Sequence, residues 1–238
     1  QSGTSMASPI AAGCAAMIKS KFPSMNALQV AEQLRSTADN IYSVPGNSPY
    51  ISKLGKGRVN LFRAVTDSIS PGVVVKKINV TDGNDGVFVI GDTLNVSNLL
   101  WNLLRPTTNL TCTIAAPTTP FVQILNNTHT VGVLSTNDTL SNFAAPYRIV
   151  VLPGTPLNLE VVLRITINDG SWSDVFSFKV IINEDYININ VNDIATSITS
   201  KGLTGYNQSG QVQGLGFRYQ GSPTILYEMS LMVGASGT

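Results

Sequence analysis

Near its start the chain reads Ser2-Gly-Thr-Ser-Met-Ala-Ser-Pro9, and this stretch runs directly into an apolar segment from Met6 to Ile18. The segment is rich in Ala and Gly and has almost no polar side chain, which is typical of a helix that is buried on all sides. Ser5 is therefore expected at or near the helix N-terminus, where N–H groups lack helical partners and the dipole favours negative charge. Gly3 allows unusual torsions just before it, and Pro9 cannot donate to the carbonyl of Ser5.

The same stretch resembles the nucleophile motif of the subtilisin-like serine proteases, Gly-Thr-Ser-Met-Ala-x-Pro. On that resemblance Ser5 is the catalytic nucleophile, the substrate is a protein or peptide, and the apolar segment is the central helix of an α/β catalytic domain. The alternative is a small-residue core helix with a Ser/Thr cap, which so many matching positions disfavour. The residues that support the motif around Ser5 are Gly3, Thr4, Met6, Ala7 and Pro9.

Two further segments extend the resemblance. Leu28 to Ile41 is an amphipathic helix pattern that contains Ser36-Thr-Ala38, as the corresponding family segment does. Leu54 to Val65 is similar to the closing family signature, a Gly-x-Gly-Arg-Val-Asn turn that leads into a short helix. The matches cover residues 1–67, which would be the C-terminal fragment of a subtilisin-like catalytic domain.

A serine nucleophile needs a base and a carboxylate that orients the base. The family places an Asp, a His and an oxyanion-hole Asn before the Ser, and none of the three can be assigned here. The single histidine, His129, follows the serine, and its context favours a turn or a strand edge. Asp39 is interpreted as a helix-end or turn residue. We therefore expect the 238-residue chain alone to be inactive.

Composition limits the other function classes. Charged residues make up 12% of the chain and the net charge is +1, so no basic stripe points to nucleic acid. No apolar run approaches the length of about 18 residues that a membrane span needs. The resemblance implies a secreted or cell-surface protein. Because the chain begins with Gln1 and has no signal peptide, we expect a partial sequence. Cys14 and Cys112 lie in different segments and are both expected to be free.

From about residue 68 the sequence changes to short Val/Ile/Leu/Thr-rich runs separated by Pro, Gly, Asn and Asp. Leu157–Ile167 and Trp172–Ile182 are two of these runs. Leu157–Ile167 alternates in part and Val175–Ile181 alternates in the same way, and Asn168-Asp-Gly-Ser171 between the two runs is a strong hairpin signal. We predict an all-β, immunoglobulin-like sandwich over residues 68–184. Residues 185–238 read as the start of a further, incomplete β-rich module. The other predicted strands are Val73–Val80, Thr93–Leu100, Thr108–Ile114, Phe121–Leu125, Tyr147–Val151, Tyr186–Val191, Gly214–Tyr219 and Ile225–Val233.

The loop that follows Val80 resembles loops in accessory sandwich domains of secreted bacterial proteases. Asp82, Asn84 and Asp85 are oxygen donors that could bind calcium, the single cofactor candidate. The loop does not follow the EF-hand pattern, because Val87 stands where that pattern has Gly. A plain turn is therefore favoured over a calcium site.

The sequence is compatible with two functions. The first is a secreted serine endopeptidase, which depends on Ser5 and its companion motifs. The second is a non-catalytic, β-rich binding or adhesion protein of the cell surface that carries a degenerate protease remnant. The ligand of the accessory region cannot be read from the sequence.

Overall fold

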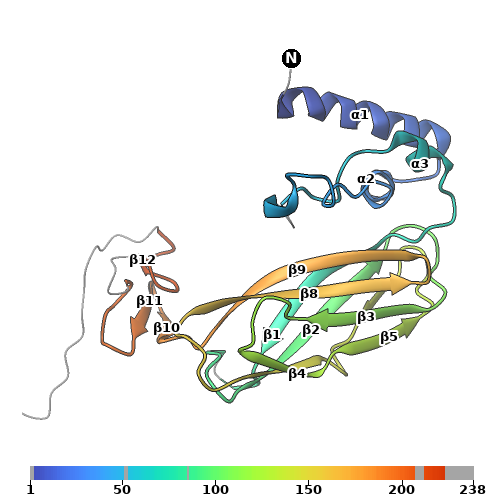
Figure 1. Ribbon diagram of the computed structural model, residues 1–238. Helices are drawn as coiled ribbons and strands as arrows, with labels where there is room; N and C mark the ends of the chain where they lie inside the picture. The colour runs from blue at the N-terminus through green and yellow to red at the C-terminus, as the bar shows by residue number, and fades with distance from the viewer. Residues whose placement is uncertain (1–2, 51–52, 85, 207–211, 223–238) are drawn as a thin grey trace, which may run out of the picture.

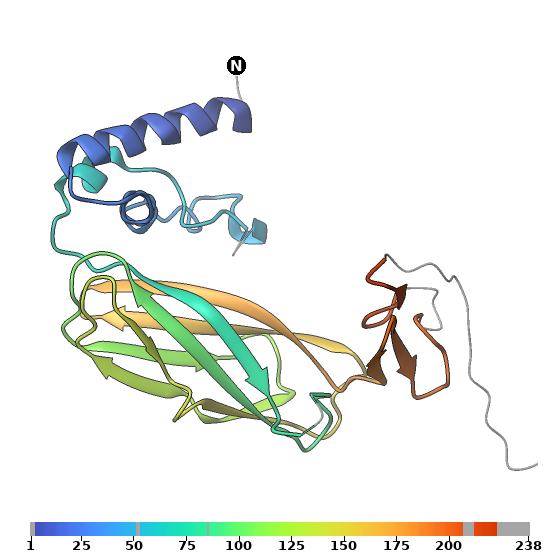
Figure 2. The same cartoon turned by 180° about the vertical axis from the view of Figure 1, so that it is seen from behind.

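The computed structural model describes residues 3–50, 53–84, 86–206 and 212–222. Three parts follow one another along the chain: a helical unit within residues 3–67, a two-sheet body within residues 72–182, and a small terminal sheet after residue 185 (Figure 1). The helical unit lies over one end of the body, and the terminal sheet lies beyond its other end (Figure 2).

The helical unit contains α1 (Thr4–Lys21), α2 (Ala27–Ser36), a short 3-10 turn (Ser48–Tyr50) and α3 (Leu61–Thr66). Gly3 precedes α1 with a φ of 141°, which confirms that this position needs a torsion that favours glycine. Asn26 caps α2 in a reciprocal pair with Gln29. Asn60 caps α3 by accepting the backbone N–H of Arg63.

Helix α1 is buried on one side only, so the expectation of burial on every side is wrong for this structure. Cys14 and Ile18 are buried, whereas Met6, Ile10 and Met17 are 41%, 65% and 55% exposed. The physical reason is that α2 and α3 cover one face of α1, and no other described segment packs on the rest.

A small apolar cluster holds the helical unit together. Its buried members are Ile18 of α1, Met25, Val30 of α2 and Ala64 of α3, together with Leu104. Leu104 belongs to the two-sheet body, where it follows the second strand. The core of the helical unit is thus completed by a residue from outside it.

The two-sheet body confirms the all-β prediction for this region. One sheet has the order β1-β2-β7-β4 with β6 beside β2, the other has the order β5-β3-β8-β9, and all pairs are antiparallel. Inward-facing residues of both sheets form one core, which includes Leu100, Tyr147 and Ile165. The strands are β1 (Val73–Thr81), β2 (Thr93–Asn102), β3 (Leu110–Ala115), β4 (Val122–Asn126), β5 (Thr128–Gly132), β6 (Thr139–Ser141), β7 (Tyr147–Val151), β8 (Leu159–Asp169) and β9 (Trp172–Ile182).

Strands β8 and β9 form the hairpin that the sequence predicted. Their register runs from Leu159 opposite Ile182 to Asp169 opposite Trp172, so Gly170 and Ser171 are the two turn residues. Gly170 has a φ of 65°, as a two-residue hairpin turn requires. The alternate residues Val161, Leu163, Ile165 and Ile167 are all buried, which confirms the predicted inward face of β8.

The terminal sheet has the order β10 (Tyr186–Val191), β11 (Ile194–Thr199) and β12 (Phe217–Tyr219). The strand predicted over Ile225–Val233 lies outside the described residues, and the domain boundaries at residues 67 and 184 stay predictions. Both cysteines are free and buried, as expected. None of the helices described here has the length and apolar character to cross a membrane.

Candidate functional site

Ser5 is the second residue of α1, and its side chain is exposed. The carbonyl of Gly3 accepts the N–H groups of Met6 and Ala7 at 3.1 and 3.2 Å, which closes the first turn around the serine. Pro9 lies inside the helix and has no N–H for the carbonyl of Ser5. The structure therefore places Ser5 at the helix start that the sequence predicted. Its role as a nucleophile stays a prediction.

His129 lies on β5, the edge strand of its sheet, opposite Cys112 of β3. This position confirms the strand-edge interpretation. Burial lowers the pKa of the imidazole, and Nδ1 has no hydrogen-bond partner among the described residues. Figures 1 and 2 show β5 on the side of the body that faces away from α1. The structure does not bring His129 to Ser5.

Asp39 is a structural residue of the helical unit. Its carboxylate accepts a hydrogen bond from Asn60 at 2.8 Å and pairs with Arg58 at 3.1 Å and Arg63 at 3.3 Å. These hydrogen bonds, first from Asn60 and then from Arg58, lower the pKa of Asp39. Asp39 lies three residues beyond the end of α2, in an isolated β-bridge with Arg58, and joins this segment to the closing turn. It is a structural residue, as the interpretation as a helix-end or turn residue implied, but it stands in a bridge rather than in the helix end itself.

The close approach of the Asp39 backbone explains why position 57 of the closing turn is a glycine. Its φ is 118°, and a Cβ added to it would overlap the carbonyl oxygen of Asp39. The backbones of Asp39 and Arg58 exchange two hydrogen bonds at 2.7 and 3.0 Å beside it. The two motifs found in the sequence, the Ser-Thr-Ala segment and the Gly-x-Gly-Arg-Val-Asn turn, are thus in direct contact.

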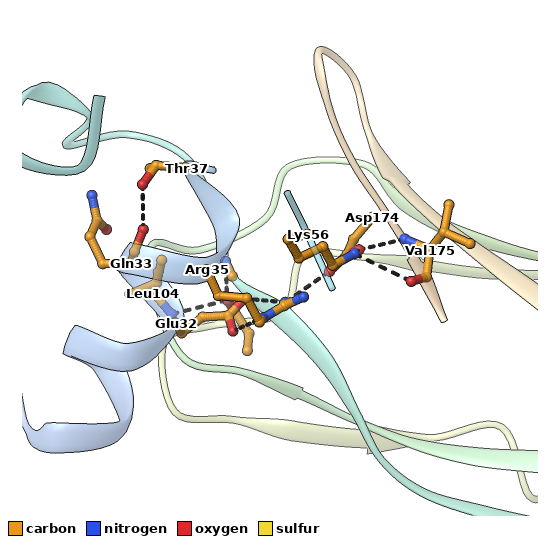
Figure 3. Close-up of polar contacts among 10 residues, drawn as sticks. Glu32, Gln33, Arg35, Thr37, Lys56, Leu104, Asp174 and Val175 are labelled. Carbon is orange, nitrogen blue, oxygen red and sulfur yellow. Dashed lines mark hydrogen bonds and ion pairs between the residues drawn. The ribbon is translucent and has the colours of Figure 1, made fainter. Parts of the chain in front are cut away.

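A group of charged side chains joins the helical unit to the two-sheet body (Figure 3). Arg35 of α2 binds both oxygens of Glu32 at 2.6 and 2.7 Å and reaches Asp174 of β9 at 2.8 Å. Lys56 pairs with the other oxygen of Asp174 and donates to the carbonyl of Val175 at 3.3 Å. Glu32 and Asp174 are only 3% and 9% exposed. Each of these buried carboxylates is paired with a cation, as a buried charge requires.

Hydrogen bonds between the helical unit and the β2–β3 connection extend this junction. Gln29 donates to the carbonyl of Leu103 at 2.9 Å, and Arg105 donates to the side chain of Gln33 at 2.9 Å. Gln33 itself is 1% exposed and donates to the carbonyls of Ala64 and Asp67. Sequence reasoning missed the junction. One available signal was Asp174, an acid on the inward face of β9 between apolar residues.

In the loop that carries the calcium candidates, the side chain of Asp82 accepts backbone hydrogen bonds from residues that follow it. Oδ1 of Asp82 accepts the N–H groups of Asn84 and Gly86 at 3.1 and 3.2 Å. Asp85 lies outside the described residues. Within the described ranges, no three His, Cys, Asp or Glu side chains gather as a metal site would need. The hydrogen bonds are those of a plain turn, and calcium binding stays a prediction.

Comparisons with known proteins agree with the motifs at the N-terminal end. Residues 1–71 match the model of the subtilase family, Peptidase_S8. Subtilisin DY of Bacillus licheniformis is 51% identical over 59 residues, which are 25% of this chain and 19% of that protein. The N-terminal region is therefore subtilase-like. The chain spans about a fifth of the length of this curated relative.

Among solved structures, a part of alpha-2-macroglobulin from Escherichia coli matches 52% of this chain and 19% of its own at 14% identity, with a TM-score of 0.37. A FixG-related protein from Vibrio parahaemolyticus matches 49% of this chain and 98% of its own at 11% identity, with a TM-score of 0.31. At these scores the likeness does not establish a common fold.

Proposed function

We propose that this chain is part of a secreted subtilisin-like serine endopeptidase in which Ser5 is the nucleophile. The observation that carries the proposal is the subtilase match over residues 1–71, together with the position of Ser5 in the first turn of α1. The substrate class is protein or peptide, and the subtilase relationship favours action outside the cell or at its surface.

In the proposed reaction a base takes the proton of the Ser5 hydroxyl while the oxygen attacks the peptide carbonyl. Negative charge then develops on the carbonyl oxygen, close to the N-terminus of α1, where the helix dipole and unpaired N–H groups stabilise it. The amine leaves with the proton from the base, and water releases the acyl group from Ser5. The base and its orienting carboxylate come from residues outside this chain, so the chain alone is inactive.

The exposed side of α1 fits this proposal. A helix with exposed Met6, Ile10 and Met17 on its surface needs an apolar partner to be stable. In a complete catalytic domain that partner would be the parallel sheet on which the central helix packs. The same contact would hold Ser5 in a fixed position.

We further propose that the two-sheet body is an immunoglobulin-like accessory domain. When the strands are lettered along the chain as in immunoglobulin domains, the sheet β1-β2-β7-β4 has the order A-B-E-D. In the other sheet, β3, β8 and β9 correspond to C, F and G. Strands β5 and β6 are additions between D and E. A weak calcium site at Asp82, Asn84 and Asp85 belongs to the same proposal, as does the incomplete β-rich module after residue 184.

The second candidate is a non-catalytic surface binding or adhesion protein. It is favoured by the observation that β10–β12 and the two-sheet body account for most of the described chain. In this case the helical unit would be a remnant that serves only as a support. The two candidates differ in whether Ser5 can still react.

A chimaera decides between them. The aligned 59-residue segment of subtilisin DY is replaced by the corresponding segment of this chain, and casein hydrolysis and labelling by a fluorophosphonate are measured. We expect hydrolysis and labelling at Ser5. Ser5→Ala should remove the labelling and lower turnover by about 10⁶-fold, the loss known for a subtilisin triad serine. Ser8→Ala, in the same exposed turn, is the control and should keep activity. A folded chimaera without labelling would favour the binding protein.

A further inference from the structure

The last strand of the terminal sheet, β12, runs into a tight β-turn. The backbone N–H of Ser222 donates to the carbonyl of Tyr219 at 2.9 Å, and the N–H of Tyr219 donates to the Ser222 hydroxyl at 3.2 Å. The two central residues, Gln220 and Gly221, have φ values of 49° and 73°. Positive φ at both central positions defines a type I′ turn, which joins two antiparallel strands in a hairpin.

The backbone of β12 has a free edge on the side to which this turn leads. β12 pairs with β11 on one side, and on the other side it pairs with no strand in the described part of the chain. Gln220 donates to the carbonyl of Asp193, and the carbonyl of Gly216 accepts the N–H of Ser197. Since bonded and non-bonded positions alternate along an antiparallel ladder, the N–H and C=O of Phe217 point away from β11, to the free edge.

The sequence after the turn fits the register that the turn imposes. It reads Pro223-Thr-Ile-Leu-Tyr-Glu-Met-Ser-Leu-Met-Val233 and lies outside the described residues. A two-residue hairpin would pair Pro223 with Arg218 and Thr224 with Phe217. Proline has no N–H, and in this register it falls at a position whose N–H would point away from β12. Thr224, which has an N–H, falls opposite the edge-facing N–H and C=O of Phe217.

The apolar alternation of the same segment fits the sheet as well. In this register every second residue shares the sheet face of Arg218. On β10 and β11 that face carries Tyr186, Ser197 and Thr199, which are 6%, 0% and 6% exposed. It is therefore the face that the terminal sheet buries. The residues that alternate onto it are all apolar or aromatic: Ile225, Tyr227, Met229, Leu231 and Val233.

We propose that residues 223–233 dock on the free edge of β12 as the fourth strand of the terminal sheet. Thr224 exchanges two backbone hydrogen bonds with Phe217, and the strand continues to Val233. An uncovered strand edge is a template for pairing with another chain, so this strand closes the edge from within the molecule. The inference extends the β-rich module proposed after residue 184. It depends neither on Ser5 nor on the proposed proteolysis, and the Ser5→Ala variant should keep the strand.

Nuclear magnetic resonance on the whole, isotope-labelled chain tests the register. In a non-bonded antiparallel pair the two Cα atoms approach to about 4.5 Å, so we expect a nuclear Overhauser contact between the Hα atoms of Arg218 and Pro223. The amides of Phe217 and Thr224 should exchange slowly with solvent, and the amide of Ile225, which faces away from β12, should exchange fast. Absence of the Hα contact, or fast exchange at Phe217, would overturn the proposal.

Two proline substitutions form a matched pair. Thr224→Pro removes an N–H that donates to Phe217, so exchange of the Phe217 amide should become roughly two- to tenfold faster. Ile225→Pro removes an N–H that faces away from β12 and should leave this rate unchanged. Equal rates in the two variants would contradict the register. Protection of Phe217 that is lost on dilution of the unsubstituted chain would show that a second copy covers the edge, and would overturn the proposal.

Discussion

Leu104→Ala tests whether the two-sheet body supports the helical unit. Leu104 is 2% exposed and is the one member of the small apolar cluster that the body contributes, beside Ile18, Met25, Val30 and Ala64. Its truncation should open a cavity in that cluster and leave the main core, whose members lie between the two sheets, intact.

The size of the effect follows from the burial of this side chain. A buried Leu→Ala change costs about 2–5 kcal/mol, from lost transfer free energy and the cavity that remains. That range corresponds to a roughly 30- to several-thousand-fold rise in the population of the open state. Since the cluster has only five buried members, we expect even the lower value to open the helical unit.

Native-state hydrogen exchange measures this directly. In Leu104→Ala, amides of α2 near Val30 should exchange faster by the stated factor, while amides of β8 near Ile165 keep their protection. Leu125→Ala on β4 is the control, because Leu125 is 52% exposed and its truncation should change stability by no more than about 0.5 kcal/mol. Unchanged exchange in α2 would refute the anchoring role of Leu104. Equal loss in β8 would refute the separation into two cooperative units.

Three further predictions concern single residues. Gly57→Ala should destabilise the helical unit in urea unfolding by more than Gly46→Ala, by about 1–3 kcal/mol, because both have a positive φ but only Gly57 has a backbone oxygen in the way. The pKa of Asp39 is lowered by Asn60 and other donors, so its stabilisation should be present above its unfolded pKa of about 4 and be lost as the pH falls further; Asp39→Asn should flatten the dependence of the urea midpoint between pH 6 and pH 3. Burial raises the pKa of Cys112 to about 12, so iodoacetamide at pH 8 should leave Cys112 unmodified in the native chain and label it in urea, as peptide mass spectrometry would show; labelling in the native chain would contradict its burial.

Local sequence patterns predicted the helices and strands that bury an apolar face formed by residues close together in the sequence. The β8–β9 hairpin was readable because apolar alternation and the Asn-Asp-Gly-Ser turn signal at residues 168–171 act over neighbouring residues. α2 was readable for the same reason, although the predicted pattern ran to Ile41 and the helix ends at Ser36, after which Asp39 pairs with the backbone of Arg58. By contrast, β5 contains Thr128-His-Thr and was missed, because this edge strand is held by pairing with β3 rather than by burial of an apolar face.

The candidate site was predictable only in part. The motif placed Ser5 at a helix start, which the structure shows, but the burial of α1 depends on a partner that no local pattern supplies. The junction could not be read, since Arg35 and Asp174 are 139 positions apart and meet only after both units have folded. The resemblance identified Gly57 as part of a signature, and only the contact with Asp39 explains why a glycine stands there.

The separation between Arg35 and Asp174 also bears on synthesis by the ribosome. The two partners are separated by 139 positions. At a translation rate of about 5–20 residues per second, Asp174 is synthesised roughly 7–28 s after Arg35. Leu104 emerges earlier, so the apolar cluster can close before the charged junction does. During this interval Glu32 and Arg35 have each other as partners, and the hairpin of β8 and β9 completes the attachment when it emerges.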